Sequence, residues 1–234
     1  METSENPALN IVVPVYNEKE SFPNLYEELK EKVKTPFSLI VVYDFKEDNT
    51  LPVAKKISAK DKRVRLVKNK RGRGALNAIL SGFDEVKSGP LLVVMADLSD
   101  DIKIIDDMYG EYLKGAKVVC GSRYMKGGSQ IGGPLVKKTL SRIAGVTLYV
   151  LTRIPTHDVT NSFKLYDKAF IDSINIESSG GFEIGMEITV KAYKNKQKIV
   201  EIPSKWLDRA NGESNFKLWS WLPSYIKWYL YALI

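Results

Sequence analysis

The sequence is poor in the two residues that most often bind transition metals: it has one cysteine, Cys120, and one histidine, His157. A single cysteine excludes an internal disulfide framework and any zinc cluster built from cysteines, and it is typical of a reducing compartment. A single histidine argues against histidine-rich metal sites and leaves a Ser-His-Asp hydrolase dependent on one residue. We expect Cys120 in the core and His157 in a loop, with contact to a phosphate as the alternative for His157.

The chain also lacks any apolar run near the roughly 18–20 residues that a membrane-spanning helix needs. Its first residues show no basic segment followed by an apolar one, so no signal peptide is expected. The sequence does carry excess positive charge, with 35 Lys+Arg against 28 Asp+Glu and a net charge of +7. This excess favours an anionic partner. The basic residues are dispersed and no recognition motif occurs, so we expect no nucleic acid.

Short apolar runs alternate with amphipathic stretches in the first half of the chain. The runs cover residues 9–15, 39–43, 64–67 and 91–95. Helical spacing of apolar residues covers 22–33, 51–57 and 76–86. This alternation predicts an α/β fold with a mainly parallel central sheet flanked by helices. The second half is less regular, and we expect one domain over residues 1–215 followed by an aromatic, amphipathic segment over 216–234.

Polar and acidic residues follow three of the predicted strands. These groups are residues 14–18, Asp44 with Glu47 and Asp48, and Asp97 with Asp100 and Asp101. Ligands of such sheets bind at the carboxyl ends of the strands, so the three groups are expected to meet. Asp97 and Asp100 suit Mg²⁺ or Mn²⁺, which prefer oxygen ligands. The alternative is that Asp100 or Asp101 caps a helix over 102–113, and capping is compatible with Asp97 as a metal ligand.

Glycines open the helix that is predicted after the third strand. Gly72 and Gly74 stand among basic residues, and the backbone N–H groups of such a helix start attract phosphate. A dinucleotide-binding fingerprint would need a third glycine where Asn77 stands, so that interpretation is weak. The chain has no phosphate-binding motif of the Walker type.

An ordered series of short motifs resembles the family 2 glycosyltransferases, which have the GT-A fold. The motifs are 13–18, 41–50, 72–75, 95–98, 121–124, 158–164 and 209–214. The series is most similar to the dolichol-phosphate mannose synthase branch, whose acceptor is a polyprenyl phosphate. The chain departs from the family pattern at Tyr43 and Phe45, and Met95 replaces the first acid of the metal motif, which weakens the expected metal site.

The resemblance implies site residues by matching position. For the nucleotide sugar, GDP- or UDP-linked, these are Pro14, Tyr16, Glu18, Asp44, Gly72, Gly74 and Asp97. For the acceptor phosphate they are Arg123, Lys138, Arg142 and Arg209, and for Mg²⁺ or Mn²⁺ they are Asp97 and Asp100. The catalytic set is Asp97, Arg123 and Arg209. Arginine pairs bidentately with phosphate oxygens, which suits these tasks.

The implied activity is transfer of a hexose, with mannose or glucose favoured, to the phosphate oxygen of a polyprenyl phosphate. An ionised phosphate needs no strong general base, which fits the scarcity of histidine. The alternatives are a nucleotide-sugar-binding homologue without turnover and a transferase with a non-lipid acceptor. Glu183 and Glu187 share a predicted helix face, which is either solvated or, for Glu187, close to the sugar or acceptor.

The last residues are rich in tryptophan and tyrosine, which prefer the membrane–water interface. We expect segment 216–234 to lie on a membrane surface, with the protein peripheral on the cytoplasmic face. The alternatives are a helix docked on the domain or pairing with a second subunit.

Overall fold

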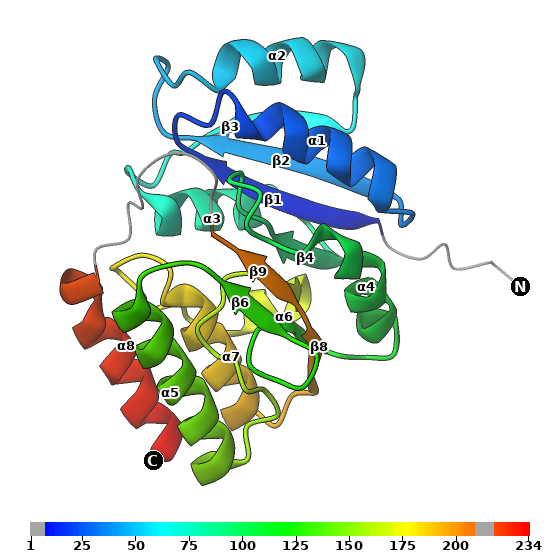
Figure 1. Ribbon diagram of the computed structural model, residues 1–234. Coiled ribbons are helices and arrows are strands. Elements are labelled where there is room, and N and C mark those ends of the chain that lie inside the picture. Colours follow the sequence, from blue (N-terminus) through cyan, green and yellow to red (C-terminus); the bar gives the residue numbers. More distant parts are fainter. Residues whose placement is uncertain (1–7, 209–217) are drawn as a thin grey trace, which may run out of the picture.

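A computed structural model describes residues 8–208 and 218–234 of the chain. A twisted sheet runs through the molecule with helices on both of its faces (Figure 1). The strands of the described chain are β1 Leu9–Val15, β2 Phe37–Tyr43, β3 Val64–Lys68, β4 Pro90–Val93, β5 Val118–Ser122, β6 Ser129–Ile131, β7 Lys164–Asp167, β8 Ile199–Pro203 and β9 Lys205–Leu207. The helices are α1 Ser21–Lys32, α2 Leu51–Lys60, α3 Ala75–Asp84, the short 3₁₀ helix η1 Ile102–Ile104, α4 Ile105–Leu113, α5 Leu135–Thr152, α6 Lys168–Ser173, α7 Ile184–Lys194 and α8 Leu218–Leu233.

The main sheet has seven strands in the order β3-β2-β1-β4-β7-β5-β8. Strands β1 to β4 pair in parallel, and β7 lies antiparallel between β4 and β5. The predicted α/β class with a mainly parallel sheet is therefore confirmed. The predicted runs differ from the observed strands only at their ends, since β2 begins at Phe37 and β4 ends at Val93.

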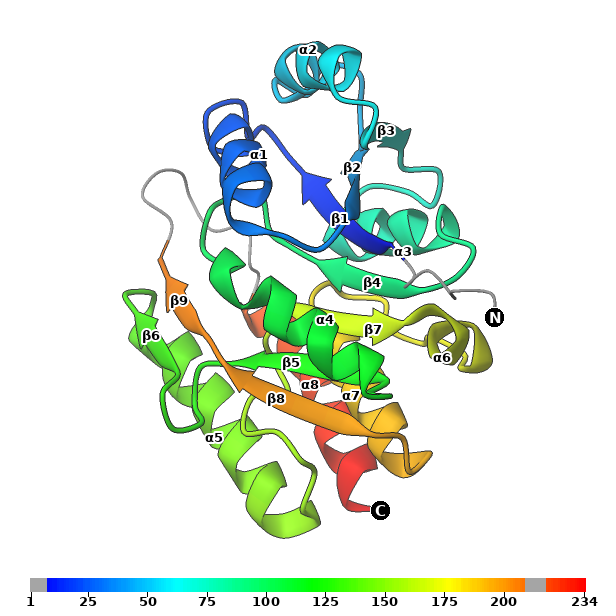
Figure 2. The same ribbon diagram turned by 90° about the vertical axis from the view of Figure 1, so that its right-hand side faces the viewer.

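Successive residues of the strands enter different cores, one on each face of the sheet. Val12 of β1 and Ile40 of β2 pack with α3, α5, α7 and α8, whereas Ile11 and Leu39 pack with α1, α2 and α4. Side chains of a strand alternate between faces, so a sheet covered on both sides needs nearly continuous apolar strands. The helices lie in two layers on opposite faces of the sheet (Figure 2).

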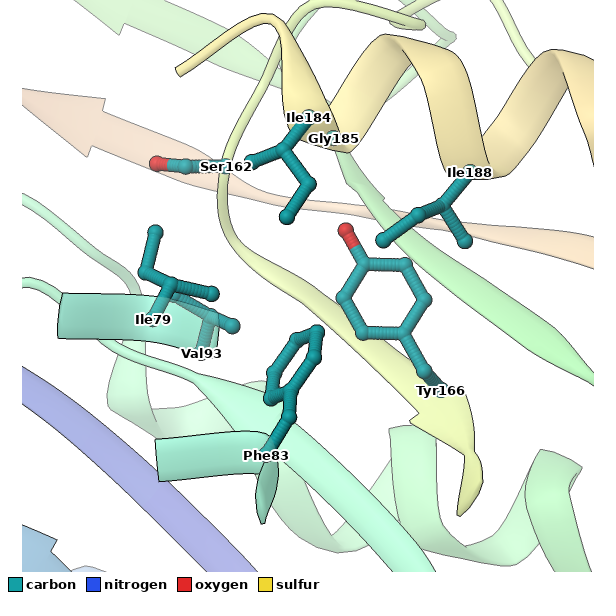
Figure 3. A pocket seen from close by; sticks show the side chains of 8 residues that line it. All are labelled: Ile79, Phe83, Val93, Ser162, Tyr166, Ile184, Gly185 and Ile188. Atoms are coloured by element: carbon teal, nitrogen blue, oxygen red, sulfur yellow. The ribbon is translucent and has the colours of Figure 1, made fainter. Parts of the chain in front are cut away.

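A small apolar space lies within the first of these cores. Figure 3 shows the side chains around it, among them Ile79 and Phe83 of α3, Tyr166 of β7 and Ile188 of α7. It has no room for the centre of a water molecule. We therefore regard it as part of the packed core and not as a binding site.

The C-terminal helix α8 docks on the domain, which is one of the alternatives that the sequence leaves open. Trp228 and Ala232 of α8 are buried in the core, and the Tyr229 hydroxyl donates to Thr147 Oγ1 of α5 over 2.8 Å. Helices α5 and α8 lie side by side and run in the same direction (Figure 1). Within the described residues, no helix has both the length and the apolar character needed to cross a bilayer.

Candidate active site

The loops after β1 and β2 form one hydrogen-bonded unit at the carboxyl edge of the sheet. The backbone N–H of Asn17 donates to both carboxylate oxygens of the buried Asp48, over 3.2 and 3.1 Å. The backbone N–H of Glu18 donates to Thr50 Oγ1 over 2.8 Å. The Glu18 carboxylate accepts from Ser21 of α1, and Pro14 is buried in β1 opposite Val42. The predicted residues of the first loop are thus fixed against the second.

Asp44 joins the end of β2 to the glycine-rich loop before α3. Its carboxylate accepts from Asn69 Nδ2 over 2.7 Å and from the backbone N–H of Gly74 over 2.8 Å. Gly72 and Gly74 have φ values of +100° and +119°, which side-chain-bearing residues rarely adopt. The structure therefore brings together the three predicted nucleotide-sugar residues Asp44, Gly72 and Gly74.

An aromatic pair with a guanidinium group lies at the rim of this edge. The Tyr16 ring is 53% exposed and meets the Phe45 ring edge-on, with 5.6 Å between centroids. The Arg73 guanidinium lies 5.2 Å from the centre of the Phe45 ring. The rim offers an exposed aromatic surface and a cation, which suit a nucleobase and a phosphate respectively.

The loop after β4 carries the predicted metal residues. Asp97 Oδ1 accepts from the backbone N–H and the hydroxyl of Ser99, over 3.1 and 2.6 Å. Leu98 adopts φ of +63°, which is rare for a residue with a bulky side chain. Asp100 is only 8% exposed and accepts from the backbone N–H of Met95 over 2.8 Å.

The alternative in which the side chain of Asp100 or Asp101 caps the following helix is wrong: Asp101 stands at the N-cap position of η1, but its side chain makes no capping hydrogen bond. Asp100 is turned to Met95, and Asp101 accepts from the backbone N–H of Lys205 in β9 over 3.1 Å. The predicted helix over 102–113 begins instead with η1 and continues as α4. The acidic loop is thus tied to β9, whose Leu207 N–H also donates to the carbonyl of Ser99 over 3.1 Å.

Burial raises the pKa of Asp100 to about 7, because the charged carboxylate is removed from water. The hydrogen bond from Met95 opposes this shift, the charges of Asp97 and Asp101 add to it, and Arg123 opposes it. Asp100 therefore keeps its proton to a higher pH than an exposed aspartate does. A cation bound in the loop would displace that proton.

A divalent cation fits this loop only if the substrate supplies most of its ligands. No cluster of three or more His, Cys, Asp or Glu side chains suited to a metal occurs within residues 8–208 and 218–234. Mg²⁺ is commonly held by one or two carboxylates together with substrate phosphates and water. The half-buried Asp97 fits that role, whereas Asp100 fits it only after losing its proton.

Arg123 lies in a buried cluster beside this loop. Its Nε and Nη2 atoms donate to the two carboxylate oxygens of Asp158 over 2.7 and 2.8 Å. Nη2 also donates to Ser141 Oγ over 3.0 Å and to Thr160 Oγ1 over 3.2 Å. The side chains of Arg123 and Asp158 are 9% and 0% exposed. Burial alone would raise the pKa of Asp158, but Arg123 prevails and holds this pKa below its usual value.

The other predicted phosphate residues have different positions. Lys138 of α5 donates from Nζ to the carbonyl of Gln130 over 2.9 Å, and Arg142 is exposed next to Ser141. Arg209 lies outside the described residues. The structure therefore gathers Lys138 and Arg142 on the helix whose Ser141 contacts Arg123.

An apolar groove lies between α5 and α8, and the sequence analysis did not predict it. Its volume is about 280 Å³. The lining includes Leu140, Ile143 and Ala144 of α5, Met186 of α7 and Leu222, Tyr225, Ile226 and Tyr229 of α8. Arg123, Ser141 and Thr160 line the same groove, so an apolar cavity is joined to the buried polar cluster.

Glu183 and Glu187 are buried, so the interpretation of a solvated helix face is wrong. Both are 0% exposed. The Glu183 carboxylate accepts from the backbone N–H groups of Gly180 and Gly181, and Glu187 accepts from those of Glu177 and Ser178 and from Lys191 Nζ. They hold the loop over 177–181 against α7.

The lone cysteine and the lone histidine have structural environments. Cys120 is fully buried in β5, and burial raises the pKa of its thiol to about 11. His157 Nδ1 lies 2.6 Å from Glu201 Oε1, and its ring stacks on that of Tyr149 with 3.8 Å between centroids. His157 thus joins the loop before β7 to β8 and α5.

Comparisons with known proteins show which family and which proteins the chain resembles. Residues 10–174 match the family described as Glycosyl transferase family 2. The chain is 27% identical over 214 residues to a dolichol-phosphate mannosyltransferase of Pyrococcus furiosus, covering 89% of this chain and 59% of that protein. It is 27% identical over 210 residues to a polyprenol monophosphomannose synthase of Mycolicibacterium smegmatis, covering 87% and 79%. The chain thus spans less than two thirds of the length of the archaeal relative.

Solved structures support the fold. Glucosyl-3-phosphoglycerate synthase of Mycobacterium tuberculosis, in complex with Mn²⁺, UDP and glucosyl-3-phosphoglycerate, superposes with a TM-score of 0.70 and 14% identity. The match covers 97% of this chain and 80% of that one. At this identity the likeness establishes a common GT-A fold, as the sequence predicted.

The buried Asp100 predicts a stability that falls with rising pH. The folded pKa of about 7 exceeds the unfolded value of roughly 3.9, so the folded state binds more protons between these values. The free energy of unfolding without metal should fall by on the order of 2–4 kcal/mol across that interval. Asp100→Asn should remove most of this dependence, and urea unfolding from pH 4 to 8 measures it.

Asp107→Asn, at an exposed position of α4, is the matched control and should leave the pH dependence unchanged. An Asp100→Asn variant with the same pH dependence as the wild type would contradict the raised pKa.

Proposed function

The chain belongs to glycosyl transferase family 2, and on that premise we propose that it transfers a hexose from a nucleotide diphosphate sugar to a polyprenyl phosphate. The groove between α5 and α8 carries this proposal, because it combines apolar walls with the buried Arg123 cluster. A polyprenyl phosphate has the same two parts, an apolar chain and an anionic head. Two relatives of this chain are named for mannosyl transfer to such lipids, which favours mannose.

The donor is assigned to the carboxyl edge of β1, β2 and β4. Tyr16 and Asp44 lie on fixed loops there and would contact the base and ribose, with GDP or UDP as the nucleotide. Gly72 and Gly74 precede α3, whose first backbone N–H groups favour phosphate oxygens, while the N–H of Gly74 itself donates to Asp44. The exposed Arg73 adds positive charge at the same place.

In the reaction, a phosphate oxygen of the lipid attacks the anomeric carbon of the sugar. The bond from that carbon to the diphosphate breaks, and the nucleoside diphosphate leaves with the bonding electrons. The attacking oxygen is already ionised at neutral pH, so the chain need not supply a strong base. The main electrostatic demand falls on the leaving diphosphate. Mg²⁺ or Mn²⁺ bound at Asp97 would neutralise that charge.

The loop proposed to hold the cation of the donor diphosphate lies beside the cluster proposed for the acceptor phosphate. Asp97 and Asp100 lie in the loop beside Arg123, which forms an ion pair with Asp158. Lys138, Arg142 and Arg209 are the further candidates for the acceptor phosphate, on the resemblance of their positions to the family motifs. Their cationic groups would attract the lipid head without taking part in proton transfer.

A membrane surface is the proposed location, on the cytoplasmic side. We call the exposed apolar residues beside the groove the α5–α8 face: Leu135, Val136, Val150 and Leu151 of α5, and Leu230 and Leu233 of α8. Exposed apolar area of this kind on neighbouring helices suits an interfacial position. Lys227 and Arg142, both exposed, could meet anionic headgroups.

Transfer itself is tested with radiolabelled GDP-mannose, GDP-glucose, UDP-glucose and UDP-galactose, a polyprenyl phosphate, and Mn²⁺. We expect label in the lipid extract with one donor, and a loss of about 100-fold or more in Asp97→Asn because the cation loses its protein carboxylate. Asp107→Asn is the control. If the protein binds a donor but transfers no sugar, either to the lipid or to phosphoglycerate, it is a nucleotide-sugar-binding protein without turnover. If it transfers sugar to phosphoglycerate but not to the lipid, its acceptor is a soluble molecule.

Filling the groove should block the lipid without affecting the donor. Ala144→Trp places a large ring in the groove and should lower transfer at limiting lipid by about 100-fold, since each excluded CH₂ group is worth about 0.8 kcal/mol. Thr139→Trp, at an exposed position of the same helix that does not belong to the groove lining, should leave transfer unchanged. Equal transfer rates in the two variants would exclude the groove as the acceptor site.

Membrane association depends on the α5–α8 face. The double variant Leu151→Glu with Leu230→Glu should lose flotation with vesicles of phosphatidylglycerol and phosphatidylcholine, because it buries charge in the interface. Leu113→Glu, at an exposed leucine of α4, is the control. Wild-type protein that stays unbound to these vesicles would refute the proposed location.

A further inference from the structure

Tyr225 belongs to α8, yet it lines the groove together with Arg123, Ser141 and Thr160. Its position along the groove follows from Tyr229, one helical turn later, whose hydroxyl is bonded to Thr147 of α5. The two helices run in the same direction (Figure 1), so Tyr225 lies nearer than Tyr229 to Ser141. Ser141 is the α5 residue that contacts the Arg123 guanidinium.

Several contacts on other sides of α8 fix this position. The buried Trp228 ring lies 4.9 Å from Lys191 Nζ and 4.6 Å from Lys227 Nζ. Lys227 also forms an ion pair of 3.0 Å with Glu177. Gly181 lies directly against the Trp221 ring, since a Cβ atom at this glycine would be 2.8 Å from it. These contacts hold α8 against the rest of the protein, so the helix forms one wall of the groove.

The polar end of the groove needs donors beyond Arg123. Two of the guanidinium nitrogens are bonded to Asp158, so the positive charge of the pair is largely compensated. A bound phosphate would face a neutral pair, and its remaining oxygens would need other hydrogen-bond donors. Lys137 of α5, which lines the groove, supplies charge.

The Tyr225 hydroxyl meets this need as a neutral donor. Burial raises the pKa of Tyr225 above its usual value, and the nearby charge of Glu183 adds to this while that of Arg123 opposes it. The group therefore remains protonated at neutral pH. Tyr225 and Arg123 line the same groove, which is the geometric basis for a shared ligand.

We propose that Tyr225 binds the acceptor phosphate, its hydroxyl donating a hydrogen bond to a phosphate oxygen held beside Arg123. The C-terminal helix thereby contributes a binding residue to the acceptor site in addition to closing the groove. This role rests on the proposed function, because it takes the lipid phosphate as the ligand of the groove.

The test compares Tyr225→Phe with Tyr231→Phe, using farnesyl phosphate as a soluble acceptor and farnesol as a competitor without phosphate. Tyr225→Phe should raise the KM for farnesyl phosphate by about 10- to 100-fold, the range for a hydrogen bond to a charged group. The Kd of the donor and the inhibition by farnesol should not change. Tyr231 is an exposed tyrosine of the same helix and is not among the residues that line the groove, so Tyr231→Phe should leave this KM unchanged.

An unchanged KM in Tyr225→Phe would overturn the proposal. So would a rise in KM matched by an equal loss of farnesol inhibition, because the ring would then act only through packing. Wild-type protein that binds the donor but neither binds nor uses farnesyl phosphate would refute the proposed function first, and the role of Tyr225 with it.

Discussion

The buried ion pair between Arg123 and Asp158 connects the elements around the polar end of the groove. Asp158 accepts from the side chain and the backbone N–H of Arg123 and from the backbone N–H of Asn161. Such a pair is stable in the interior only when its hydrogen bonds are complete, because desolvation of two charges is costly. It joins the end of β5, the loop before β7 and, through Ser141, helix α5. The polar end of the groove owes its shape to this pair.

The loops at the carboxyl edge of β1 and β2 are organised by backbone hydrogen bonds to carboxylates. Asp48 fixes the loop after β1, and Asp44 fixes the loop before α3. These loops need little further ordering when a nucleotide binds, and pre-ordering reduces the entropy lost on association. The loop after β4 differs, since burial raises the pKa of Asp100 and so favours its protonated form.

Much of the fold could be predicted from the sequence because its first strands are continuous apolar runs. The run over 9–15 coincides with β1, and the runs that follow match β2 to β4 within a few residues. Strand β7 could not be predicted in this way. It has four residues and begins with Lys164, whose ammonium group is buried against the carbonyls of Val159 and Asn161. A lysine that is satisfied by backbone carbonyls gives no apolar signal.

The positions of the candidate site residues could be predicted to the same extent as the sheet. Asp44 and Asp97 follow strands, and parallel strands end at one edge of a sheet, so their position at this edge could be predicted. The burial of Glu183 could not be predicted, because its partners are backbone N–H groups of a glycine loop, and such partners leave no pattern in the sequence. The groove was missed for a related reason: its walls are α5 and α8, which lie far apart in the chain. The aromatic residues of α8 predicted a position at a membrane–water interface, but they did not predict which side of the helix packs against the protein.

Helix α8 connects these parts, since its sides have different surroundings. Trp228 is 1% exposed in the core, Tyr225 lines the groove, and Leu230 is 52% exposed beside it. Because its core side is packed against the domain, the groove side and the outer side of α8 have fixed positions relative to the rest of the protein. If the outer side lies on a bilayer, the groove lies at the bilayer surface as well. A lipid phosphate could then reach the Arg123 cluster while its chain stays in an apolar environment, so extraction of the lipid into water would not limit the reaction.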